Sequence, residues 1–262
     1  MAVKTVIMIA THKEYPLPEG GCFLPVWAGA GISDKALPYQ RDDEGENISS
    51  LNPGFCELTV LYWGWKNLKD SDFIGLEHYR RRFGINGDDI DPSEIIRASE
   101  AGVRLFVPRK RHYYIESLRT HYAHTHSEEH LKVMEDVLKE KHPDVMDSYN
   151  RAMNRRYGYM FNMMIADRET LDSYCSWLFP ILFAISERVD DSGLSSYNAR
   201  LYGRLSELLF NVWIEYELST NALRNGEIRE IPYYNTEKTN WFRKGGSFLK
   251  AKFCGKKYSG SF

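Results

Sequence analysis

The feature that most constrains this chain is the apolar run at its start. Residues 4–10, with the sequence KTVIMIA, are rich in β-branched and other apolar side chains. Such a run predicts a strand that is buried on both faces, as in sheets covered by helices on each side. Thr11, His12 and Lys13 follow at once, so polar side chains stand at the carboxyl end of that strand.

The rest of the chain alternates between helical and strand patterns. This alternation predicts an α/β domain with a mainly parallel central sheet flanked by helices, in three layers. In open sheets of this kind, ligands bind beyond the carboxyl ends of the strands. The expected helices are 57–69, 127–141, 167–189 and 198–218, and the expected strands are 73–76, 104–108, 157–166 and an edge strand at 228–233.

Composition excludes several classes of protein. The 34 basic and 36 acidic residues give a net charge of -2, which argues against a nucleic-acid-binding protein. Four widely spaced cysteines without a CxxC pair indicate reduced thiols in a cytoplasmic protein. We expect no signal peptide, and the longest apolar stretch, 177–185, falls short of the ~20 residues that cross a bilayer.

We expect residues 1–240 to form one domain and residues 241–262 to form a basic, aromatic tail. The tail carries six lysines and arginines, no acidic residue, and six aromatic residues. This composition is typical of a segment that contacts an anionic membrane surface, here the inner face of the cell membrane. A solvated tail explains the same residues equally well.

The densest chemical signal is residues 75–83, with the sequence GLEHYRRRF. If the strand continues, His78 and Arg80 share one face, while Glu77, Tyr79 and Arg81 share the other. Guanidinium groups beside an imidazole can cradle phosphate oxygens. The alternative is an exposed basic turn paired with residues 88 and 89.

Further candidates come from single polar residues in apolar or turn-rich surroundings. Glu207 is the single acid in an apolar part of its helix, where burial would raise its proton affinity and suit a general base, although a pairing with a nearby arginine explains it too. Asn162 is a lone amide in an expected strand and must bond backbone or ligand. The polar loop 34–54 offers Asn47 and Asn52 to a nucleotide, or to ordinary turns.

A histidine cluster invites comparison with zinc sites. The spacing of His126 and His130 would place both imidazoles on one helix face, but the chain has no HExxH motif. Surface or capping histidines are therefore the favoured interpretation, and no metal site is assigned.

Taken in order, several motifs resemble the DUF4422 family of bacterial glycosyltransferases, which is associated with galactofuranosyl transfer in capsule, O-antigen and exopolysaccharide synthesis. The resemblance spans roughly residues 5–214. The matching segments are Ile9–Lys13, Asn47–Ser49 with Asn52, Glu57–Thr59, Tyr62–Asn67, Gly75–Phe83, Asn162–Ile165, Tyr174–Phe179 and Ser206–Asn211.

The resemblance implies a GT-A-like (Rossmann-like) fold, a UDP-sugar donor and inverting transfer to a hydroxyl of a growing, lipid-linked glycan acceptor. Glu207 matches the expected base. Donor contacts are expected from the residues named above: Thr11, His12, Lys13, Asn47, Asn52, His78, Tyr79, Arg80, Arg81 and Asn162.

The resemblance also bears on the cofactor. Most GT-A enzymes hold a divalent metal with an Asp-x-Asp motif, but here the comparable place carries residues 77–81, EHYRR. Cations could neutralise the leaving UDP directly, so transfer without a metal cofactor is expected. Two alternatives stay open: a metal-dependent transferase using Asp42 or Asp43 with a histidine, and a non-catalytic module that binds nucleotide sugars or glycans within a polysaccharide synthase complex.

Overall fold

The computed structural model describes residues 3–18, 21–190 and 200–237. A ten-stranded sheet runs through them, and its main path has the order β11-β7-β10-β4-β1-β2-β3. All neighbours on this path are parallel except β10, which is antiparallel to both β4 and β7. The path strands are β1 Thr5–Thr11, β2 Phe23–Trp27, β3 Gln40–Arg41, β4 Phe73–His78, β7 Leu105–Pro108, β10 Met164–Asp167 and β11 Ile228–Ile231.

Five short strands complete the β structure. Arg81 pairs with His78 in a tight hairpin, and this hairpin extends the sheet beyond the end of β4. The strands joined to this extension are β5 Arg81–Ile85, β6 Asp88–Asp89 and β12 Tyr233–Asn235, while β8 Arg111–His112 and β9 Tyr157–Gly158 form a separate two-stranded ribbon.

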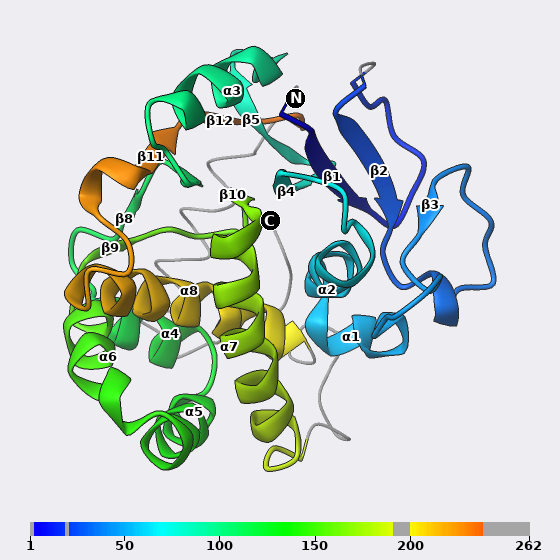
Figure 1. Cartoon of the computed structure of the whole chain (residues 1–262). Helices are drawn as coiled ribbons and strands as arrows, with labels where there is room; N and C mark the ends of the chain where they lie inside the picture. Colours follow the sequence, from blue (N-terminus) through cyan, green and yellow to red (C-terminus); the bar gives the residue numbers. More distant parts are fainter. Residues whose placement is uncertain (1–2, 19–20, 191–199, 238–262) are drawn as a thin grey trace.

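Helices cover both faces of the sheet (Figure 1). One face packs against α3, with Ile7, Phe73 and Phe106 in that smaller core. The opposite face, which carries Met8 and Leu76, packs against most of the remaining helices in a larger core. The helices are α1 Asn52–Phe55, α2 Leu58–Asn67, α3 Pro92–Glu100, α4 Leu118–Thr125, α5 Glu128–Lys141, α6 Met146–Met153, α7 Arg168–Ser186 and α8 Leu201–Ser219.

The alternation of side chains along β1 explains the two cores. Ile7 and Met8 point to opposite faces, and both are fully buried. The β-branched, apolar run at the N-terminus therefore forms a central strand between β2 and β4, as expected. The predicted α/β fold with a mainly parallel sheet and flanking helices is confirmed.

The predicted helices are observed with small shifts of their ends. The helix α7 begins after Asp167, whose side chain accepts a hydrogen bond from the Thr170 amide at 2.7 Å, and it continues through Pro180. The predicted edge strand is β11. Within the described residues, no helix combines the length and the apolar character that crossing a membrane requires. The predicted tail, 241–262, lies outside the described residues.

Two local predictions are wrong. Residues 157–166 do not form one strand: β9 ends at Gly158 and β10 begins only at Met164. The chain also turns after His78, so the strand alternation that would have put His78 and Arg80 on one face stops there. In both places, a side chain far away in the sequence holds a turn that the local sequence pattern did not predict. Asn211 bonds to the Tyr159 backbone, and Thr236 donates to the Tyr79 carbonyl.

Candidate active site

The carboxyl ends of the two central parallel strands lie side by side. Ala10 of β1 is in register with His78 of β4, so Thr11, His12 and His78 meet at one edge of the sheet. The strand β10 runs in the opposite direction and begins opposite Leu76. The turn before β10, at Phe161 and Asn162, therefore lies at the same edge.

This turn has an unusual backbone. Phe161 and Asn162 have φ values of 81° and 52°, in the left-handed region that most residues avoid. Asn162 is only 3% exposed, and its amide nitrogen donates to Glu57 Oε1 at 2.7 Å and to the Gly203 carbonyl at 2.8 Å. Its oxygen accepts from Ser206 Oγ at 2.8 Å. Asn162 therefore fixes the turn to both α2 and α8.

The same turn joins two predicted site residues. His78 Nε2 lies 2.5 Å from the Phe161 carbonyl oxygen, so this nitrogen carries the proton. The Phe161 backbone amide also acts on the Glu207 carboxylate and lowers its pKa. The backbone of one residue thus bridges the end of β4 and the middle of α8. We call His78, Arg81, Phe161, Asn162 and Glu207 the Phe161 cluster.

Glu207 has the electrostatic properties of a base that works near neutral pH. Burial, and next the charge of Glu57, raise the pKa of Glu207 to about 7. Arg111 and Arg81 act in the opposite direction. The carboxyl group can therefore exchange a proton in the working range of an enzyme, which general-base catalysis requires.

Arg81 belongs to the Phe161 cluster. Its guanidinium lies 3.6 Å from the centre of the Phe161 ring, and its Nε donates to Asn235 Oδ1 at 3.1 Å. Burial lowers the pKa of Arg81, and the carboxylate of Glu207 partly offsets this effect. A fixed cation thus lies near the candidate base.

Arg80 belongs to a second group, which we call the Tyr79 cluster: His12, Lys13, Tyr79 and Arg80. Arg80 Nε donates to the Tyr79 hydroxyl at 2.6 Å, and that hydroxyl lies 3.5 Å from His12 Nε2. Lys13 Nζ lies 5.0 Å from the centre of the Tyr79 ring. Glu237 approaches both cations, at 3.1 Å from Lys13 and 3.6 Å from Arg80.

The Tyr79 cluster is more exposed than the Phe161 cluster and more positive. The side chain of Arg80 is 45% exposed. Burial, and next the charges of Arg80, Lys13 and Arg200, lower the pKa of His12, which keeps this imidazole neutral. Thr11 is buried and exchanges hydrogen bonds with the Lys13 backbone at 2.6 and 3.3 Å. Thr11 therefore positions Lys13 in this cationic patch, which suits an anion.

The polar loop folds around a buried carboxylate. Asp42 is fully buried and accepts hydrogen bonds from the backbone amides of Gly29 and Ala30 and from the hydroxyls of Ser49 and Thr59, at 2.5–2.9 Å. Such a fully bonded carboxylate has a structural role, because its lone pairs are already occupied.

Asn47 and Asn52 support the same loop. The amide nitrogen of Asn47 donates to two loop carbonyls, and its oxygen accepts from the Ser49 amide at 3.1 Å. Asn52 donates to the Cys56 carbonyl at 2.8 Å and also packs against Gly29, where a Cβ would come within 2.8 Å of it. Contact of these two amides with a donor stays a prediction, because the contacts present are internal to the loop.

Sequence reasoning left out three groups of the site. Glu57 and Ser206 hold Asn162, and both belong to matching segments but were given no role of their own. Arg111, on the β8–β9 ribbon, lowers the pKa of Glu207, but no sequence motif marks Arg111 as a site residue. Arg200, at the start of α8, donates to Cys56 Sγ at 3.3 Å, and its charge acts on both His12 and His78.

The histidine cluster has a structural explanation. His121 and His124 each bond to the Glu116 carboxylate at 2.8 Å. His126 ends α4 and His130 lies on α5, so the predicted shared helix face is wrong. Throughout the described ranges, no group of three or more histidine, cysteine or acidic side chains is arranged to hold a metal ion.

The sequence and the fold were each compared with known proteins. The model of the DUF4422 family, described as a domain of unknown function, matches residues 6–218. No curated protein matches. The solved apo structure of the WbbM bifunctional glycosyltransferase is similar, with a TM-score of 0.80 and 22% identity over 90% of this chain and 46% of that chain. This likeness shows a common fold, over about half of that protein. Because the family model covers most of its length, the chain belongs to the DUF4422 family.

Proposed function

We propose that this protein is an inverting glycosyltransferase that moves galactofuranose from a UDP donor to a hydroxyl of a growing cell-surface glycan. The observation that carries this proposal is the Phe161 turn, which holds a carboxyl group with a pKa of about 7 beside an arginine and a histidine. The shared fold with the WbbM bifunctional glycosyltransferase supports the reaction class. The sugar and the inverting course come from the family resemblance.

Glu207 is the proposed base. Its carboxylate removes the proton of the acceptor hydroxyl while that oxygen forms a bond to the anomeric carbon. The bond from that carbon to the UDP oxygen breaks with its electron pair, so UDP leaves as the anion. Attack from the face opposite UDP converts an α-linked donor into a β-linked product. Arg81, close to Glu207, keeps the carboxylate from becoming too basic to release its proton again.

The Tyr79 cluster is the proposed site for the diphosphate. Lys13 and Arg80 are exposed cations, and Glu237 is the acid that approaches both. An incoming diphosphate would compete with Glu237 for them. Cations of this kind stabilise the charge on a leaving phosphate, a task that other enzymes give to a metal ion. We therefore propose transfer that does not depend on a divalent cofactor.

A donor screen tests the proposal. The purified protein would be incubated with UDP-galactofuranose, UDP-galactopyranose and UDP-glucose, with a glycan acceptor, and release of UDP would be followed with and without EDTA. We expect release from UDP-galactofuranose that persists in EDTA. Melting-temperature shifts without UDP release would indicate a non-catalytic binding module, and strict Mn²⁺ or Mg²⁺ dependence would overturn the metal-independent part.

A single substitution tests the diphosphate site. Arg80→Ala should weaken UDP binding about tenfold, in keeping with the loss of one charge-assisted contact. Arg97→Ala, at an exposed position of α3 outside both clusters, is a matched control of the same charge. Isothermal titration with UDP measures both. Equal affinities for the two variants would contradict the assignment of Arg80.

The acceptor and the location of the protein are proposals too. A lipid-linked acceptor would bring the enzyme to the inner face of the cell membrane, where a basic tail could help to hold it. Sedimentation with vesicles of anionic phospholipid, with and without residues 241–262, tests this contact. Cytoplasmic location follows from the composition and stays a prediction.

A further inference from the structure

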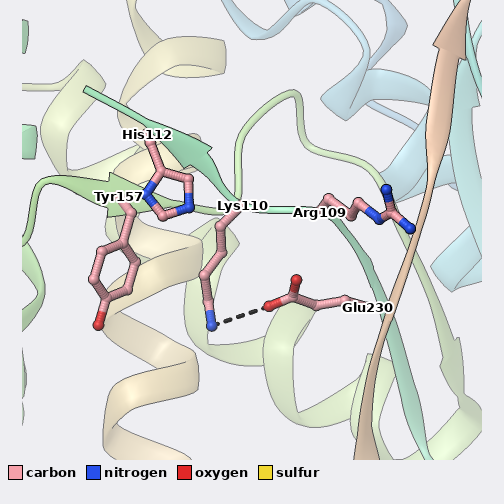
Figure 2. A pocket seen from close by; sticks show the side chains of 5 residues that line it. All are labelled: Arg109, Lys110, His112, Tyr157 and Glu230. Atoms are coloured by element: carbon pink, nitrogen blue, oxygen red, sulfur yellow. Dashed lines mark ion pairs between the residues drawn. The ribbon is translucent and has the colours of Figure 1, made fainter. Parts of the chain in front are cut away.

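A pocket lies on the surface beside the β8–β9 ribbon. It has a volume of about 440 Å³ and is lined by Arg109, Lys110, His112, Tyr157 and Glu230 (Figure 2). This volume is within the range of about 300–1,000 Å³ typical of small-molecule sites. No residue of the Phe161 or Tyr79 cluster lines it, so it is a separate feature of the molecule.

The pocket presents aromatic rings next to an ion pair. Lys110 Nζ lies 3.0 Å from Glu230 Oε1, and the Tyr159 hydroxyl donates to the same carboxylate at 3.1 Å. Figure 2 shows the Tyr157 and His112 side chains next to each other, with Lys110 between them and Glu230. The ring centres of Tyr157 and His112 are 5.7 Å apart. An ammonium group and a carboxylate side by side offer donors and acceptors within one small area.

The aromatic surface continues beyond the pocket. The ring of Tyr114 lies 6.4 Å from that of His112, and its side chain is 82% exposed. Tyr157 is 36% exposed. Tyr157, His112 and Tyr114 thus form a row of three rings along the ribbon, and such exposed aromatic residues mark recognition sites.

These features fit a sugar chain better than other ligands. Sugar hydroxyls both donate and accept hydrogen bonds, so one ring can use Lys110 and Glu230 together, while its C–H face packs on an aromatic ring. A phosphate or polyanion could pair with Arg109, but it would also meet the Glu230 carboxylate that already binds Lys110. An acyl chain would have to desolvate the ion pair. A row of rings suits several successive sugar residues.

We propose that this pocket is an auxiliary glycan-binding site that holds a neutral stretch of the acceptor polymer away from the reacting end. The choice of ligand rests on the proposed function. The chain between Tyr157 and Phe161 connects the two places: Tyr159 bonds Glu230 at the pocket and is itself held by Asn211 of α8, and the Phe161 turn follows two residues later. A polymer bound here would increase the local concentration of its own acceptor end.

Binding of a galactan oligosaccharide to the full chain, measured by isothermal titration without donor, tests the inference. Tyr157→Ala should weaken binding about tenfold, the usual cost of removing an aromatic anchor. Tyr157→Phe keeps the ring and should retain wild-type affinity. Should Tyr157→Ala fail to fold, as judged by thermal melting, Lys110→Met removes the ammonium group instead and should weaken binding similarly.

Two controls separate this site from the active site. Glu207→Gln should bind the galactan as the wild type does, and UDP titration should give equal affinities for wild type and Tyr157→Ala. No galactan binding by the wild type, or equal binding by Tyr157→Ala and wild type, would overturn the inference. So would loss of inorganic pyrophosphate binding in Tyr157→Ala, because the pocket would then be an anion site. If galactan binding depends on Tyr157 but no donor releases UDP, the glycan site stands and the proposed activity falls.

Discussion

Two carboxyl groups with raised pKa values, on opposite faces of the sheet, differ in how far a substrate can approach them. Burial raises the pKa of Glu77 to about 8, and burial with the charge of Glu57 raises that of Glu207 to about 7. Glu77 is 0% exposed, on the α3 side, where one oxygen accepts from the Phe83 amide at 2.9 Å. Its other oxygen is without a hydrogen-bond partner among the described residues. Glu207 is partly exposed and lies near two arginines.

A raised pKa does not by itself identify a base. Desolvation acts on both groups, but a proton can reach a substrate only from a group that a substrate can approach. Arg81 and the Phe161 turn give Glu207 a cation and a fixed orientation. Glu77 also has an amide donor, Phe83, and a nearby arginine, Arg82, but it is fully enclosed, so a substrate cannot approach it.

The largest expected effect is on turnover. Glu207→Gln should fold and bind UDP but lose about 10²–10⁴-fold in rate, the usual scale for loss of a general base. Glu77→Gln is the matched control, since it neutralises the enclosed carboxyl group in the same way and should retain most of the activity. Initial rates of UDP release by the two variants and the wild type measure this difference. Near-normal turnover of Glu207→Gln would reject the assignment.

The next effect is on the stability of the Phe161 turn. Asn162→Ala removes three buried hydrogen bonds and places alanine at a φ of 52°, so it should lower the free energy of unfolding by ~2–4 kcal/mol. Asn154→Ala is the control, because Asn154 is exposed and its side chain bonds only one carbonyl in the described structure. Urea unfolding at neutral pH compares them. Similar losses in both variants would show that the turn is not held by Asn162.

A third effect appears in the pH profile. A base must be deprotonated, so kcat/KM should rise about tenfold per pH unit below 7 and level off above it, near the pKa of Glu207. Arg81→Gln removes a charge that lowers this pKa, so the midpoint should move to higher pH. A midpoint near 4.5, the ordinary value for glutamate, would show that Glu207 is not the titrating group.

A fourth effect concerns the pH dependence of folding. The folded-state pKa of Glu77, about 8, is above its ordinary value of 4.5, so the protonated form is favoured in the folded protein. Its contribution to stability is full below pH 4.5 and is lost as the pH rises through about 8. Glu77→Gln cannot ionise and should flatten this dependence. Urea unfolding between about pH 5 and 8 would show the same slope for both proteins if Glu77 does not contribute.

Much of the fold could be predicted because local patterns were strong. The apolar run of β1 and the amphipathic period of α5 and α7 each match one type of element, and the structure has them at the predicted places. The segment 159–163 could not be predicted. Its apolar residues indicate a strand. However, Asn211 of α8 bonds to the Tyr159 backbone, and the Asn162 side chain bonds to the Gly203 carbonyl of α8. The positive φ values of Phe161 and Asn162 then interrupt the strand.

The candidate site divides in the same way. The sequence predicted the residue types of the site, in residues 78–81 and at Glu207. It did not predict which arginine would lie near the Glu207 carboxylate. Arg81 is the first residue of β5 and stacks on Phe161, whereas Arg80 sits in the turn and bonds to Tyr79. If the strand had continued past His78, Arg80 would share the face of His78, and Arg81 would lie on the opposite face.

The sequence by itself determined the α/β class, the central strand and the membership of a family, because periodicity and ordered motifs are local properties of the chain. Only the tertiary structure decided that one backbone turn would join His78 to Glu207 and that Arg81 would stand beside them. The physical reason is that these partners are far apart in sequence. Their hydrogen bonds and the shared desolvation that tunes Glu207 come into being only when β4, β10 and α8 have packed together.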